Sequence, residues 1–113
     1  MGPNRRQLVV VSNTSPLTNL AAIGQFGLLQ RLFGQVTIAA SVASELRFGN
    51  VDWPGAAELR TASWIDVQRA RERLVFDALR LDLDAGEAET ITLALQMKAD
   101  LMLLDERAGR LAA

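Results

Sequence analysis

Four short apolar runs divide this chain, and each has the length and composition of a β-strand. The clearest is Leu8, Val9, Val10 and Val11, in which three consecutive residues are β-branched. A continuous apolar run of this length is typical of a strand buried on both faces of a parallel sheet. The other predicted strands are residues 35–39, 64–67 and 101–104, and a turn that begins at Trp64 is the alternative for residues 64–67.

Helical patterns fill the sequence between these runs. Leu28, Leu29 and Leu32 recur at helical spacing, and Gly34 supplies a C-terminal stop. The predicted helices are residues 16–23, 26–33, 42–47, 56–61, 68–81 and 84–98, with a loop over 48–55. This alternation predicts an α/β fold, namely a three-layer α/β/α arrangement around a central parallel sheet. We expect residues 1–113 to form a single domain in which residues 1–7 are flexible.

The composition removes several classes of chemistry. The 113 residues include no cysteine and no histidine, which excludes disulfides, thiolate or imidazole metal sites and Ser-His-Asp triads. The formal net charge is -1, so binding of nucleic acid would need a local basic patch or a metal ion. No run approaches the roughly 20 apolar residues that span a bilayer, and the N-terminal run is too short for a signal sequence. We therefore expect a cytoplasmic protein with no membrane partner.

Polar residues follow the first predicted strand directly. Pro16 suits the first turn of a helix, which makes Ser15 the predicted N-cap. Asn13 then lies where a buried strand ends and a helix begins, the edge at which open α/β sheets bind ligands. Chemistry at such an edge usually needs a carboxylate, whereas this chain has an amide there.

Three carboxylates lie where a parallel topology would bring them to the same edge. Asp105 follows the last strand, Glu87 stands on the buried face at the start of the 84–98 helix, and Glu45 lies beyond the second strand. Each has an ordinary alternative: Asp84 and Glu87 form a capping box, Asp105 is a turn residue or N-cap, and Glu45 is a surface residue. Clustering them within about 5 Å would cost roughly 3 kcal/mol per pair. A divalent cation would offset that cost, and oxygen-only ligands favour Mg²⁺ or Mn²⁺.

Helical spacing also assigns the faces of the two later helices. Glu87, Ile91 and Leu95 share the face of the 84–98 helix that points to the sheet, so Glu89 on the opposite side is expected to point to water. In the 68–81 helix the arginines are interspersed with acidic residues, which favours a solvated face. Contact with a phosphate backbone is the alternative for this cluster of Arg69, Arg71, Arg73 and Arg80.

These stretches together resemble the PIN domain family. The resemblance covers residues 8–110 and rests on four segments. Its most specific part is the Gly-Glu-Ala-Glu helix followed by Ala-Asp-Leu-Met-Leu-Leu-Asp. The segments are VVSNTSPL (10–17), LLQRLFGQV (28–36) near a helix bearing Glu45, GEAETITLAL (86–95) and ADLMLLDER (99–107). The chain is most similar to a subgroup often found beside small antitoxin-like genes.

The resemblance implies a Mg²⁺- or Mn²⁺-dependent nuclease. The four acidic positions of the family fall on Asn13, Glu45, Glu87 and Asp105 as metal ligands, of which Glu45, Glu87 and Asp105 would be catalytic. The implied partners are an RNA substrate, an antitoxin protein and a second copy of the chain in a homodimer. Asn13 replaces the usual aspartate, and the chain ends soon after Asp105. We therefore expect it to lack the last helix and strand of the family.

Residues beside these four positions are candidates for contact with the substrate. Thr14 and Ser15 follow Asn13, and Arg107 follows Asp105. A second hypothesis is a catalytically silent module that binds an antitoxin-like partner or RNA, because the asparagine removes one charge from the site. A receiver-like or nucleotide-binding domain is a weaker alternative, since the sequence has no Gly-rich phosphate loop.

Overall fold

The computed structural model describes residues 8–48 and 56–104 of the chain. Within them, four strands form one sheet in the order β3-β2-β1-β4. Every neighbouring pair is parallel, with Val11 opposite Thr37, Val11 also opposite Met102, and Thr37 opposite Asp66. The strands are β1 Val10–Ser12, β2 Val36–Ala39, β3 Ile65–Gln68 and β4 Leu101–Leu103. The predicted α/β fold with a central parallel sheet is therefore confirmed.

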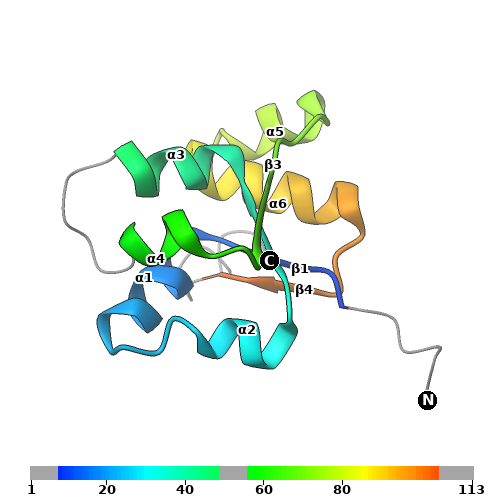
Figure 1. Cartoon of the computed structure of the whole chain (residues 1–113). Coiled ribbons are helices and arrows are strands. Elements are labelled where there is room, and N and C mark those ends of the chain that lie inside the picture. The colour runs from blue at the N-terminus through cyan, green and yellow to red at the C-terminus, as the bar shows by residue number, and fades with distance from the viewer. Residues whose placement is uncertain (1–7, 49–55, 105–113) are drawn as a thin grey trace, which may run out of the picture.

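Helices cover both faces of this sheet. In Figure 1, α3, α5 and α6 lie on one side of the strands and α1 and α2 lie on the other. The helices are α1 Thr14–Ala22, α2 Leu28–Phe33, α3 Ala40–Phe48, α4 Ala56–Thr61, α5 Arg73–Leu79 and α6 Ala85–Met97. Among the described residues, no helix is both long enough and apolar enough to cross a membrane.

The two central strands carry the core. All residues of β1 and β2 are buried, as expected for strands covered on both faces. Leu17 of α1 and Leu93 of α6 pack into the same cluster, each with no exposed surface. The polar residues that follow the strands consequently lie at one edge of a rigid sheet.

Two predictions about helix starts are wrong. The first helix begins at Thr14, with Asn13 rather than Ser15 as its N-cap. The backbone N–H of Asn13 donates to the carbonyl of Leu103 at 2.9 Å, so the chain enters the helix directly from its last contact with the sheet. Pro16 still lies in the first turn, where its missing N–H costs nothing.

The predicted helix over residues 68–81 is also wrong in its first part. Gln68 is the last residue of β3 and pairs with Ala39 of β2. The chain after it is not helical until Arg73, and α5 then runs only to Leu79. Hydrogen bonds to the sheet and to α6, which local periodicity cannot reveal, hold residues 68–71 in this non-helical conformation.

Candidate functional site

The described part of the predicted site is built where parallel strands end. Asn13 follows β1 and is only 4% exposed. Its side chain accepts no capping hydrogen bond from α1, although its backbone has the extended conformation of an N-cap. Because Ser12 pairs with Leu103, the ends of β1 and β4 are neighbours, as the sequence predicts.

Thr14 and Glu45 connect this corner to α3. The Thr14 hydroxyl donates to Glu45 Oε1 at 2.6 Å. A short hydrogen bond to a charged acceptor is among the stronger polar contacts in proteins. Glu45 itself is exposed, so its carboxylate is held in place and still accessible. The hydroxyl of Thr14 thus positions a carboxylate in this structure.

The start of α6 forms the third side of the corner. A Cβ added to Gly86 would lie 3.8 Å from Glu45 Oε1, so the glutamate carboxylate rests against the first turn of α6. In that turn, the Asp84 side chain accepts from the Glu87 N–H at 2.8 Å, and Glu87 Oε1 accepts from the Asp84 N–H at 3.2 Å. The predicted capping box is confirmed.

The capping bond determines how Glu87 is oriented. The side chain is half-buried, and its Oε1 is directed back to its own helix end. Glu87 therefore lies at the predicted end of α6, but the structure shows it closing the helix terminus. Ser15, proposed beside Thr14 as a substrate residue, is half-buried in the first turn of α1.

The remaining predicted residues fall outside the described part of the chain. Asp105 and Arg107 lie beyond Leu104, and residues 1–7, predicted to be flexible, lie before Leu8. Over residues 8–48 and 56–104, no group of three or more His, Cys, Asp or Glu side chains could hold a metal ion. What the structure brings together there is the Glu45 carboxylate, the end of β1 at Asn13 and the α6 turn that carries Glu87.

The donor set at this corner suits a hard divalent cation. It consists of carboxylate and carboxamide oxygens, and nitrogen or sulfur ligands of the imidazole and thiolate types are missing from the entire sequence. Oxygen-only ligands are typical of Mg²⁺ and Mn²⁺ sites. The residues present therefore fit such an ion in their chemistry.

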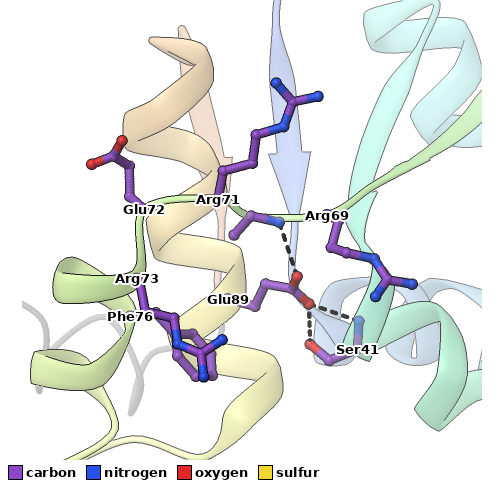
Figure 2. Close-up of a pocket in the computed structure, with 8 residues that line it drawn as sticks. Ser41, Arg69, Arg71, Glu72, Arg73, Phe76 and Glu89 are labelled. Carbon is purple, nitrogen blue, oxygen red and sulfur yellow. Dashed lines mark hydrogen bonds between the residues drawn. The ribbon is translucent and has the colours of Figure 1, made fainter.

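The environment of Glu89 differs from the one that the sequence predicts. Glu89 was expected to point to water, yet it is only 8% exposed. Its Oε1 accepts from the backbone N–H of Ser41 at 2.8 Å and from the Ser41 hydroxyl at 2.6 Å, and its Oε2 accepts from the Ala70 N–H at 3.0 Å. Figure 2 shows the carboxylate reaching from α6 to both partners.

The reason for this error is that α6 has no solvated face at this level. Residues 88–94 are all buried, because α3 and α5 contact α6 from its sides while the sheet lies beneath it. Leu95, expected on the buried face, is 63% exposed. The available signal was the run of Ala, Thr, Ile and Leu around Glu89, which is apolar or hydroxylic on every side and typical of an enclosed helix.

Comparison with known proteins identifies a family. A family model described as a PIN domain matches residues 9–113. Searches of curated proteins and of solved structures found no match. The match covers nearly the whole chain and supports a nuclease-type fold of a class that is generally dependent on divalent metals.

Proposed function

This chain belongs to the PIN domain family, and from that premise we propose that it is a Mg²⁺- or Mn²⁺-dependent nuclease that hydrolyses phosphodiester bonds in RNA. One observation carries the proposal more than any other. The Glu45 carboxylate, fixed by Thr14 at 2.6 Å, lies against the start of α6 at Gly86, at the carboxyl edge of the sheet. Ligand sites of open α/β folds are found at this edge.

Each residue of the corner has a distinct part in the proposed reaction. Glu45 and Glu87 would hold the cation, together with Asp105, while Asn13 would offer a neutral amide oxygen. When bound, the cation supplies the positive charge that activates a water molecule for attack on phosphorus and stabilises the charge that develops on the phosphate. One of the three carboxylates would orient that water or accept its proton.

The hydrogen bonds of the corner prepare these side chains for their roles. Thr14 occupies Glu45 Oε1, and the capping box occupies Glu87 Oε1. Among the described residues, neither bond uses the second carboxylate oxygen, so Oε2 of each glutamate can face a ligand. Both glutamates are thus ordered before the ion binds, which reduces the conformational entropy lost on binding.

Asn13 supports a second candidate, a catalytically silent module. An amide at the end of β1 removes one negative charge from the site, which weakens attraction for a divalent cation. In that case the fold would serve to bind RNA or an antitoxin-like protein. If the chain is a nuclease, as in the first candidate, it could act as the toxin of a type II toxin–antitoxin module. The antitoxin partner and the homodimer stay predictions from the sequence.

Cleavage of a labelled RNA separates the two candidates. The wild type should cleave it with Mg²⁺ or Mn²⁺ and stop when the metal is chelated. Glu45→Gln and Glu87→Gln should each lower the rate by about 100-fold or more, in the range expected for loss of groups that act on the reacting centre. A parallel reaction on single-stranded DNA reports which nucleic acid is preferred.

These two substitutions were chosen because they spare the fold. Glutamine can replace glutamate in a capping box, and it can still accept a hydrogen bond from Thr14. Glu58→Gln is the matched control, since Glu58 is exposed and lines a pocket beside Trp64, at the opposite edge of the sheet. Equal rates in the wild type, both variants and the control would exclude this site, and absence of Mn²⁺ binding by calorimetry would favour the silent module.

A further inference from the structure

A second concave feature lies at the same edge of the sheet, beyond β2 and β3. It is a pocket of about 280 Å³. Ser41 follows β2 at the start of α3, and residues 69–73 follow β3, so the pocket shares its edge with Asn13 and Glu45. The lining side chains that the argument uses are Ser41, Arg69, Arg71, Arg73, Phe76 and Glu89.

Three arginines contribute positive charge to this pocket. Arg69, Arg71 and Arg73 all line it, and all three are exposed. In the part of the chain that the structure describes, no carboxylate forms an ion pair with any of their guanidinium groups. Glu72, which lies between them in sequence, also lines the pocket and is exposed; Figure 2 shows it at the end of the segment away from Arg69 and Ser41. Three arginines outnumber the carboxylates of Glu72 and Glu89 in the lining, so the pocket has a formal excess of positive charge in a chain whose net charge is -1.

The segment that carries these arginines is fixed to α6. The Ala70 N–H donates to Glu89 Oε2 at 3.0 Å, and the Arg71 N–H donates to Gln96 Oε1 at 2.6 Å. Glu89 is buried and also holds the start of α3 through Ser41. Two consecutive backbone amides are thus hydrogen-bonded to one helix. The backbone positions from which the arginine side chains extend are therefore fixed.

The geometry points to a binding site for the phosphodiester backbone of single-stranded RNA. We propose that Arg69, Arg71 and Arg73 hold phosphates of the strand whose scissile bond lies at Glu45 and Glu87. This inference rests on the proposed function, because it assigns the pocket to the same substrate. Neighbouring strands are about 4.8 Å apart, so the end of β3 lies roughly 10 Å from the end of β1, a distance that a few nucleotides span.

The chemistry of the pocket favours this ligand. Guanidinium groups bind phosphate oxygens in a planar, two-pronged geometry, and they compensate for the overall negative charge of the chain. Phe76 adds a half-buried aromatic ring to the pocket wall, and aromatic rings accept stacked bases without regard to sequence. The buried Glu89 carboxylate accepts three hydrogen bonds from Ser41 and Ala70, so its main partners are not the arginines, which can bind an external anion.

The test is the salt dependence of RNA binding. Fluorescence anisotropy with a labelled single-stranded RNA of about 16 nucleotides, in EDTA to prevent cleavage, measures affinity between about 50 and 200 mM NaCl. Each phosphate contact on a single strand contributes about 0.7 to the slope of log K against log salt. The double variant Arg69→Gln/Arg71→Gln should therefore lose about 1.4 from the slope and about 25-fold in affinity at 0.1 M NaCl.

A matched control removes the same charge from the opposite edge. Arg31 lies in the last turn of α2, before β2, and Lys98 follows α6, before β4; both are exposed. Arg31→Gln/Lys98→Gln should keep the wild-type slope, and Arg69→Lys/Arg71→Lys should restore most of it, because lysine retains the charge. Equal slopes in the two glutamine variants, or no RNA binding by the wild type, would overturn the inference.

Cleavage assays distinguish a failure of the proposed RNA-binding pocket from a failure of the proposed nuclease activity. If the wild type cleaves RNA while the slope is indifferent to Arg69 and Arg71, the pocket is not a substrate site and the proposed function stands. If the slope depends on Arg69 and Arg71 while Mn²⁺ produces no cleavage, the pocket binds RNA backbone and the nuclease proposal fails. If the pocket binds an acidic protein instead of RNA, the Arg69 and Arg71 variants should bind RNA with the wild-type affinity and salt dependence.

Discussion

Asn13 shows how one side chain can leave a fold intact and change the charge of a site. Its backbone performs two structural tasks: it donates to Leu103 across the sheet and caps α1. Neither task depends on the side chain, which makes no capping bond. An amide and a carboxylate have nearly the same shape, so residue 13 can exchange one for the other with little effect on packing.

We therefore expect Asn13→Asp to bind Mn²⁺ at least about tenfold more tightly, a gain of about 1.4 kcal/mol. The gain is smaller than the Coulomb attraction of about 4 kcal/mol between unit charges 4 Å apart at an effective dielectric of 20, because a buried carboxylate also loses hydration. Isothermal titration calorimetry measures it. Asn19→Asp adds the same charge at an exposed position of α1, and an equal gain there would show that only net charge matters.

Glu89 illustrates the opposite case, a charged side chain whose role is structural. Three donors from two separate segments converge on its carboxylate. Glu89→Gln replaces one acceptor oxygen with an NH₂ group, which leaves either Ala70 or Ser41 without its acceptor. The free energy of unfolding should fall by about 1–3 kcal/mol.

Urea denaturation monitored by circular dichroism measures that loss. Glu72→Gln is the control, because Glu72 is exposed and its side chain does not cap α5. Its free energy of unfolding should stay within about 0.5 kcal/mol of the wild type. A Glu89→Gln protein as stable as this control would mean that the three hydrogen bonds contribute nothing net to stability.

At the scale of elements, the junction of α3 and α6 is the contact on which the candidate site depends. Gly86 stands in the first turn of α6, with Val42 of α3 and Glu45 as its neighbours. A Cβ there would meet Val42 Cγ2 at 3.7 Å and Glu45 Oε1 at 3.8 Å, which are ordinary contact distances. The glycine is therefore not required by packing, and its lack of a side chain leaves the Glu45 carboxylate open.

Gly86→Ala should separate stability from activity. Alanine in a helix is more stable than glycine by about 0.5–1 kcal/mol, so the midpoint of urea unfolding should rise. RNA cleavage should fall by about tenfold if access to the Glu45 carboxylate limits the reaction. Gly27→Ala is the control, since Gly27 has helical dihedral angles and no atom within 4 Å of an added Cβ. Unchanged cleavage in Gly86→Ala would show that this approach is not used.

The elements also show which features local sequence can specify. The run at 8–11 predicts a strand because all residues of β1 are buried between helices, and such a strand carries mainly apolar residues. The run at 101–104 also predicts its strand correctly, although Leu101 and Met102 of β4 are exposed. The same reasoning fails for residues 68–72, since their pattern of Ala and Arg fits a helix while their conformation is set by Ala39, Glu89 and Gln96. Partners that lie far away in sequence decide such a segment, and periodicity does not contain them.

At the scale of the molecule, the parallel sheet gathers the site. The sequence placed Asn13, Glu45 and Glu87 at one edge because parallel strands end together, and the structure brings the segments bearing them into contact. Side-chain direction was harder to predict. Glu89 is buried and Leu95 is exposed, the reverse of the prediction. The reason is that α3 and α5 pack against α6, and this packing arises only in the assembled fold. Asp105 stays a prediction, since it lies outside the described residues.

Stability should be distributed unevenly over this molecule. Every residue of β2 and seven consecutive residues of α6 are buried, whereas α5 has no buried residue and its Leu74 is 85% exposed. Elements with few buried contacts open by local fluctuation at a lower free-energy cost than the core. The segment just before α5 differs, because its amides at Ala70 and Arg71 are bonded to α6 side chains.

Native-state hydrogen exchange should therefore divide residues 70–79 at the start of α5. We expect the α5 amides to exchange with opening free energies at least about 3 kcal/mol below those of α6, while Ala70 and Arg71 are protected like the helix that holds them. Glu89→Gln should reduce protection at Ala70 and leave β2 unchanged. Mass spectrometry on peptides spanning 65–80 measures both effects. Equal protection of the α5 and α6 amides would contradict this prediction. It would mean that α5 is as stable as α6, and that residues 70 and 71 are not more firmly fixed than the helix that follows them.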